Sequence, residues 1–214
     1  HPRVPTDVRA AIRRLAEENP SWGGPRIHGE LLKLGFAVSE RTVACYLPKR
    51  PPDPDKIRRW MAFLRNHKDG IAAMDFFVVP TAAFRLLYGL VIVEHARRRV
   101  VHFNVTEHPT AEWVVLQLRQ AFPYDTAPRY LIFDRDSIFN DRVVAAIRGM
   151  GTEPARTAFR APWQNPIAER LVGTIRRDLL DHVVIFGEDH LRRLMAEFIG
   201  YYHADRTHLG LEKD

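Results

Sequence analysis

The sequence predicts an α/β protein, in which a mixed five-stranded sheet flanked by helices follows a small all-α module. Two observations support this prediction. Apolar residues recur at helical spacing over the first 48 residues, whereas from Ile71 onward they form strand-like runs. The first three runs follow one another as an antiparallel meander and the later strands alternate with helices, which is typical of a layered α/β domain.

Composition limits the possible classes of protein. The chain has 214 residues, 46% of them hydrophobic, which is enough for one full core and a smaller module. Its single cysteine, Cys45, excludes a disulfide framework and favours a reducing intracellular setting, and we expect Cys45 to be a small buried residue. The longest apolar run, near residues 86–93, is too short for a membrane span, so we expect a soluble protein without a membrane partner.

The positive charge is concentrated near the N-terminus. Residues 1–68 carry 14 Lys and Arg against 7 Asp and Glu, whereas the rest of the chain carries 18 against 19. Basic side chains near phosphates release counterions, so this segment is suited to a nucleic-acid partner. On charge alone, a basic surface that only keeps the protein soluble has roughly equal weight.

Residues 1–48 predict three short helices. Thr6 and Ser39 are the expected N-caps of the first and third helices, Asn19-Pro20 follows the end of the first, and Gly35 is the expected C-cap of the second. A glycine-containing turn before the last helix is typical of a helix-turn-helix, whose last helix would offer Arg41 and Thr42 to a major groove. A helical bundle that binds nothing is the alternative, which the basic excess disfavours.

Residues 49–68 predict a linker and a docking helix. Pro51-Pro52 and Pro54 lie among charges, so the first part should be stiff and solvated and should mark a domain boundary. The apolar cluster around Trp60 predicts a short helix that docks onto the next domain.

Residues 69–214 predict the sheet domain. The expected strands cover residues 71–79, 84–94, 100–105, 130–134 and 152–155. The expected helices cover residues 111–122, 143–150, 166–181 and 190–202, with Thr110 and Asn165 as N-caps of the first and third.

Three acidic residues are candidates for a shared site. Asp75 interrupts the middle of the first strand, where an unpaired charge is costly. Asp134 ends the fourth strand, and Glu169 lies on the following helix. If the first and fourth strands are neighbours, the three carboxylates form an all-oxygen site suited to Mg²⁺ or Mn²⁺. Taken singly, they could be a salt-bridge partner, a turn residue and a helix-terminus charge.

Several motifs occur together in this chain. They are Met74-Asp-Phe-Phe77, Asp134-Arg-Asp-Ser-Ile-Phe139, Pro162-Trp-Gln-Asn-Pro-Ile-Ala-Glu-Arg170, Thr174-Ile-Arg-Arg-Asp178, the tail Tyr201 to Leu211, and, upstream, Gly23 to Glu30 with Ser39 to Val43. The combination resembles the integrase core shared by retroviral integrases and bacterial insertion-sequence transposases, with the helix-turn-helix that precedes it. The resemblance covers almost the whole chain and implies a ribonuclease H-like catalytic core over residues 69–214.

The resemblance implies that Asp75, Asp134 and Glu169 are catalytic residues and metal ligands of a DDE-type polynucleotidyl transferase, holding two Mg²⁺ or Mn²⁺ ions in the active complex. This chain departs from the family pattern in two ways. Asp136 stands where many relatives have Gly, so it competes with Asp134 as the second ligand. Only 34 residues separate Asp134 from Glu169, one fewer than the commonest family spacing, which implies a shortened loop.

Further residues are candidates for DNA contact. They are Arg41, Thr42, Trp163, Gln164, Asn165, Arg170, Arg176 and Arg177. The last three are equally compatible with a solvated helix face. Tyr201, Tyr202, Arg206 and His208 are expected to form a packed hydrogen-bonded cluster behind the site.

The resemblance also implies partners and a setting. These are double-stranded DNA, both element ends and target, a homodimer or higher multimer on that DNA, and the bacterial cytoplasm at the nucleoid. Two alternatives remain open. A catalytically inactive DNA-binding remnant predicts the loss of a ligand carboxylate, and none is missing here. A nuclease of the same fold would cut without joining, which the upstream module and the tail disfavour.

Overall fold

The structure is a computed structural model that describes residues 4–19, 22–48, 53–158 and 161–204. The chain divides into two compact units, His1–Asp53 and Pro54–Asp214. The expected linker residues 49–52 and the tail residues Arg206 and His208 lie outside the described residues. None of the helices that the structure describes has the length and apolar character that a bilayer crossing requires.

The first unit consists of the helices α1 (Thr6–Glu18), α2 (Gly24–Lys33) and α3 (Glu40–Tyr46). Its core contains Val8, Ile12, Ala16, Ile27, Leu31 and Val43. The prediction of Ser39 as an N-cap is confirmed, because its side chain accepts a hydrogen bond from the Thr42 N–H at 3.2 Å.

Two expectations for the first unit are wrong. Thr6 is not the N-cap of α1, because the helix already includes it and Pro5 precedes it without a side-chain hydrogen bond. Cys45 is exposed. It follows the buried Val43 by two positions, which on a helix places it on the opposite side from the core.

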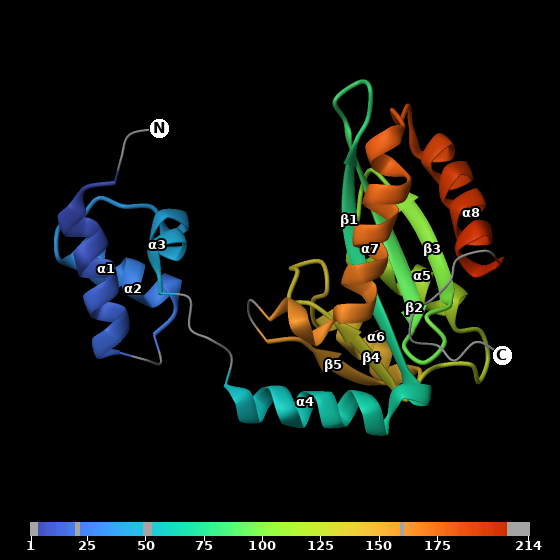
Figure 1. Cartoon of the computed structure of the whole chain (residues 1–214), viewed down its shortest axis with the longest axis horizontal. Coiled ribbons are helices and arrows are strands. Elements are labelled where there is room, and N and C mark those ends of the chain that lie inside the picture. Colours follow the sequence, from blue (N-terminus) through green and yellow to red (C-terminus); the bar gives the residue numbers. More distant parts are fainter. Residues whose placement is uncertain (1–3, 20–21, 49–52, 159–160, 205–214) are drawn as a thin grey trace. The chain divides into compact units, whose positions relative to one another are not determined.

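The second unit contains a five-stranded sheet in the order β3-β2-β1-β4-β5 (Figure 1). The strands are β1 (Ile71–Pro80), β2 (Leu86–Glu94), β3 (Val100–Thr106), β4 (Tyr130–Phe133) and β5 (Glu153–Arg156). The first three are antiparallel, and β4 is parallel to both β1 and β5. The predicted mixed α/β sheet is therefore confirmed. β2 starts at Leu86 and not at Phe84, because Phe84 adopts a φ of 58° in the turn and is 92% exposed.

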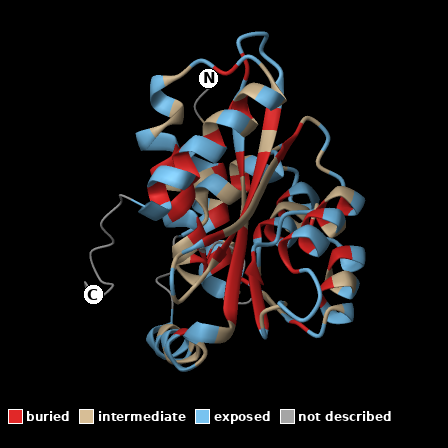
Figure 2. Cartoon of the chain, turned by 90° about the vertical axis from the view of Figure 1, so that its right-hand side faces the viewer, coloured by how far each residue is buried: buried red, intermediate tan, exposed pale blue. Residues whose placement is uncertain are grey.

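Helices cover both faces of this sheet, and the strands between them are mostly buried (Figure 2). The helices α5 (Ala111–Ala121) and α6 (Asp141–Gly149) pack on one face. The helices α7 (Pro166–Asp178) and α8 (Glu188–Ala204) pack on the other, where α4 (Pro54–Asn66) adds Leu64. Short 3-10 turns cover Lys68–Gly70, Pro162–Gln164 and Leu180–His182.

β1 sends alternate side chains to the two helical layers. Ala73 and Phe77 join the core under α7 and α8, whereas Ala72 and Met74 join the core under α5 and α6. Because side chains alternate along a strand, Asp75 lies on the same face as Ala73 and Phe77. The strand therefore presents its one carboxylate to the α7 side of the sheet.

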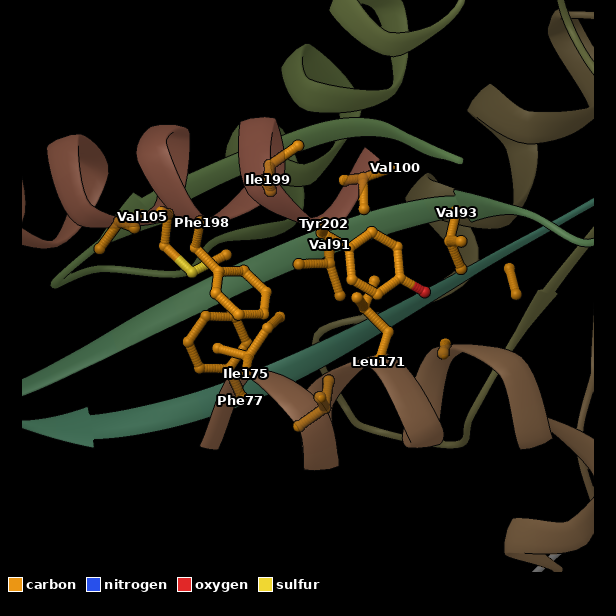
Figure 3. Packing of buried hydrophobic residues seen from close by; sticks show 14 of the residues in the cluster. Phe77, Val91, Val93, Val100, Val105, Leu171, Ile175, Phe198, Ile199 and Tyr202 are labelled. Carbon is orange, nitrogen blue, oxygen red and sulfur yellow. The ribbon is translucent and has the colours of Figure 1, made fainter. Parts of the chain in front are cut away.

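The ring of Phe77 occupies space that only a glycine leaves free. Phe77 lies opposite Gly89 in the β1–β2 ladder, and it packs with Ile175 and Phe198 (Figure 3). A Cβ atom on Gly89 would meet the Phe77 ring at 2.2 Å. Any side chain at Gly89 therefore forces the ring out of its position.

We expect Gly89→Ala to lower the free energy of unfolding by roughly 1–3 kcal/mol, the usual cost of overpacking a core. Gly200→Ala is the matched control, since Gly200 lies in α8 and a Cβ atom there would meet no other atom within 4 Å. At that position alanine should add about 0.5–1 kcal/mol through helix propensity. Urea denaturation of both variants measures the difference, and equal stabilities would contradict this packing.

Candidate active site

Two neighbouring strands place Asp75 and Asp134 side by side. β1 and β4 are parallel, with Ile71 paired to Tyr130 and Ala73 to Ile132. Asp134 directly follows the last residue of β4. Continued at the same offset, the register puts Asp134 opposite Asp75, next to the end of β4.

The helix α7 supplies the third carboxylate. It packs against β1 through a buried face that includes Ala168, Leu171 and Ile175. Glu169 lies in its first turn and is exposed at the edge of that face. Asn165 is the N-cap residue of α7, and Pro166 is its first helical residue.

Burial and neighbouring negative charges raise the pKa of two of these carboxyl groups, Asp75 and Glu169. Burial raises the pKa of Asp75 to about 7, and the negative charges of Asp134 and Glu169 contribute to this rise, against a lowering by the Phe76 N–H and by Arg176. Burial and the charge of Asp134 also raise the pKa of Glu169. These effects place Asp134 and Glu169 within electrostatic range of Asp75.

The carboxylates of Asp75, Asp134 and Glu169 do not surround a common point. Among the described residues, no three His, Cys, Asp or Glu side chains are arranged so that they could already hold one metal ion. The three acidic donors are all carboxylate oxygens, the donor type that Mg²⁺ and Mn²⁺ prefer, so the donor chemistry fits such an ion.

Asp136, the competing second ligand, has a local role. The Asp136 N–H donates to Asp134 Oδ1 at 3.0 Å, while its own Oδ1 accepts from the Ile138 N–H at 3.0 Å and from the Ser137 hydroxyl at 3.3 Å. Its carboxylate therefore closes the turn after β4. The charge that acts on Asp75 belongs to Asp134.

Arg176 is a cation whose charge reaches this cluster. It lies two helical turns after Glu169, and its charge lowers the pKa of Asp75. Arg170, Arg176 and Arg177 are all exposed, and none of them takes part in a salt bridge within the described part of the chain. Three guanidinium groups on α7 are thus available to an external anion.

The residues that lead into α7 are held by the protein itself. Gln164 Oε1 accepts from the Ala158 N–H at 2.5 Å, and the Gln164 carbonyl accepts from the Trp60 indole at 3.1 Å. Asn165 donates to the Met74 carbonyl at 3.1 Å and is only 3% exposed. Trp163 is half-buried.

The N-cap prediction for Asn165 is correct in position and wrong in contact. Asn165 occupies the N-cap of α7, but its side chain makes no capping hydrogen bond. The amide donates instead to the carbonyl of Met74 in β1, 91 residues earlier.

In the first unit, Arg41 is exposed on α3, while the hydroxyl of Thr42 contacts Ser39 at 2.9 Å.

Sequence reasoning missed the contacts made by Trp60 and Asn165 and the effect of Arg176 on Asp75. The last could have been inferred, because residues seven apart on a helix share one face and Arg176 follows Glu169 by that spacing. The other two join residues far apart in sequence, and no local pattern indicates them.

Comparison with known proteins supports the fold. Residues 150–214 match the family model described as integrase core domain. Among solved structures, the chain is similar to a simian T-cell lymphotropic virus intasome in complex with PP2A regulatory subunit B56 gamma (TM-score 0.56, 12% identity, covering 94% of this chain and 71% of that one). No curated protein sequence gives a significant match.

The chain is also similar in structure to two solved catalytic domains. The Mos1 transposase catalytic domain with raltegravir and Mg has a TM-score of 0.57 at 12% identity, covering 68% of this chain and 79% of that one. The HTLV-2 integrase catalytic core domain in complex with magnesium has a TM-score of 0.50 at 13% identity, covering 66% and 90%. The second unit therefore has the ribonuclease H-like fold of integrase and transposase catalytic cores.

The raised pKa of Asp75 predicts a pH-dependent effect of Asp75→Asn. Between about pH 4 and pH 7 the unfolded chain releases the Asp75 proton while the folded chain keeps it, so this group lowers wild-type stability as pH rises. Without metal, Asp75→Asn should be as stable as wild type near pH 4 and more stable by roughly 1–3 kcal/mol at pH 8.

Chemical denaturation at both pH values in EDTA measures this difference. Addition of Mg²⁺ at pH 8 should then stabilise the wild type and leave Asp75→Asn unchanged. A stability difference that is the same at both pH values would contradict the burial of an ionisable Asp75.

Proposed function

We propose that this protein is a DDE-type polynucleotidyl transferase, a transposase or integrase that cleaves DNA phosphodiesters at the ends of a mobile element and joins them to a target. The observation that carries the proposal is the parallel β1–β4 register, which at a constant offset puts Asp134 opposite Asp75, on the sheet face covered by the helix that carries Glu169. Three acidic residues from distant parts of the sequence are thus candidates for one site on the α7 side of the sheet, near the end of β4. The integrase core match over residues 150–214 supports the same class of reaction.

Asp75, Asp134 and Glu169 would hold Mg²⁺ or Mn²⁺, with two ions in the active complex. Such ions activate the attacking water or 3′-hydroxyl and neutralise charge on the phosphate. The protein fixes the positions of the three proposed ligands. Asp75 lies in β1, Asp134 directly follows β4, and Glu169 lies on the helix packed against this sheet, which would limit their movement relative to the phosphorus.

The α7 arginines are the proposed contacts to the DNA backbone. Arg170, Arg176 and Arg177 lie on the helix that carries Glu169, and they are exposed. Phosphate contacts of this kind fix the register of DNA without reading its sequence. Arg176 also offsets part of the negative charge beside Asp75.

The first unit is the proposed reader of element ends. Its last helix, α3, presents Arg41, and Thr42 lies beside the Ser39 cap. We assign double-stranded DNA as the partner, with a homodimer or higher multimer pairing two ends, in the bacterial cytoplasm at the nucleoid. Trp163, half-buried beside α7, is the remaining candidate for contact with the DNA end.

A strand-transfer assay tests this proposal. The full chain is incubated with Mn²⁺, a plasmid and labelled, pre-nicked DNA ends from the sequence that flanks its coding region. We expect joined products, and we expect Asp75→Asn, Asp134→Asn and Glu169→Gln each to reduce them by roughly 100-fold or more, as loss of a charge-stabilising group does.

Asp136→Asn is the matched control. It keeps the Oδ1 atom that closes the turn and removes only the charge, so joining should stay within about threefold of wild type if Asp134 is the ligand. Shortened strands without joined products would identify a nuclease. DNA binding with neither product would identify an inactive remnant.

A further inference from the structure

Asn165 connects the backbone of one carboxylate-bearing element to that of another. Its carbonyl accepts a hydrogen bond from the N–H of Glu169 at 3.1 Å, within the first turn of α7. Its side-chain Nδ2 donates to the carbonyl of Met74, also at 3.1 Å. Met74 directly precedes Asp75, so one residue links the neighbours of two proposed metal ligands.

The Met74 contact lies where the β1–β4 ladder stops. β1 pairs with β4 only from Ile71 to Ala73, and Met74 is the first residue beyond that paired stretch. Asn165 is 3% exposed, so water does not compete for this hydrogen bond. A buried carbonyl left without a donor is costly, which gives the contact a strong orienting effect.

The orientation of the amide indicates what it does. An N-cap asparagine ordinarily turns its oxygen to the N–H groups of its own helix. Here α7 receives no such bond, and Asn165 Oδ1 is buried without a partner among the described residues. The Asn165 side chain therefore does not cap α7, and it donates a hydrogen bond to the Met74 carbonyl in β1 instead.

Trp60 holds the same segment from another side. Its indole Nε1 donates to the carbonyl of Gln164, the residue before Asn165, at 3.1 Å. The ring packs near Phe63 at a centroid distance of 5.2 Å, and both belong to α4. Two consecutive residues at the start of α7 are therefore fixed, one to α4 and one to β1.

We propose that Asn165 is a positioning residue that fixes the start of α7 against β1, with Trp60 as its support, and so keeps Glu169 near Asp75 for binding of a shared metal ion. The inference rests on the proposed metal-dependent function. It replaces the direct DNA contact that the sequence alone predicted for Asn165.

The test measures Mn²⁺ binding by the full chain with isothermal titration calorimetry, without DNA. Asn165→Ala removes both the hydrogen bond and the side-chain volume. Asn165→Leu removes the hydrogen bond and keeps a similar volume. We expect both to weaken Mn²⁺ binding by about 10-fold or more, the usual effect of losing a group that orients a ligand.

A double-mutant cycle separates positioning from general destabilisation. In the Glu169→Gln background, Asn165→Leu should change Mn²⁺ affinity by about twofold or less, because the ligand that it positions is already lost. Thr110→Ala is the stability control, since it removes the N-cap contact of α5 to the Trp113 N–H, on the face of the sheet opposite α7. It should leave Mn²⁺ affinity unchanged.

Trp60→Phe tests the supporting contact, because it deletes the indole N–H and retains an aromatic ring. We expect Mn²⁺ binding to weaken by about threefold, the value of one neutral hydrogen bond.

The outcomes are distinguishable. Wild-type affinity in Asn165→Leu, or an undiminished effect of Asn165→Leu in the Glu169→Gln background, would overturn the positioning role while leaving the proposed function in place. Absence of Mn²⁺ binding by the wild type would overturn the proposed function and this inference with it.

Discussion

The central constraint on the structure is a carboxylate, Asp75, in the middle strand of the sheet, where burial opposes its ionisation. Asp75 stands in β1, which has strands on both sides and helical layers on both faces. Burial and two neighbouring carboxylates oppose its ionisation. A stable scaffold tolerates such a group only if surrounding packing offsets the cost, and the apolar side chains of β1 and α7 supply that packing. Perturbed carboxylates of this kind cluster at functional sites.

The positions of the three carboxylates depend on different elements of the fold. Asp75 lies in β1 and Asp134 directly follows β4, and the parallel ladder between these strands ends two residues before each of them. Glu169 belongs to a helix, and its position follows from how that helix starts. The contacts of Asn165 and Trp60 act at that start. A shortened loop before Glu169 is compatible with this arrangement, because the anchoring contacts lie at the end of the loop and on the helix.

Much of this arrangement could be predicted from the sequence, because it is encoded locally. Apolar runs defined the strands, and the charge that interrupts the first run identified Asp75. The ribonuclease H-like pattern makes the first and fourth strands neighbours, and the structure confirms this and shows that they are parallel. Ser39 and Thr110 cap their helices as local patterns predict.

The incorrect predictions have physical causes that local sequence patterns do not contain. Asn165 has a hydrogen-bond partner 91 residues away, and the tertiary contact outweighed the local capping preference. Phe84 fits a strand by residue type, yet the turn requires a positive φ at that position.

The proposed chemistry requires Asp75, Asp134 and Glu169 to hold a divalent metal ion together. The decisive measurement is a crystal structure of the full chain soaked in Mn²⁺, with the ion located by its anomalous scattering. We predict a Mn²⁺ peak within about 2.0–2.3 Å of carboxylate oxygens of Asp75 and Asp134, with Glu169 moved toward the same site. A Mn²⁺ ion held elsewhere, or held by Asp136 in place of Asp134, would contradict this prediction.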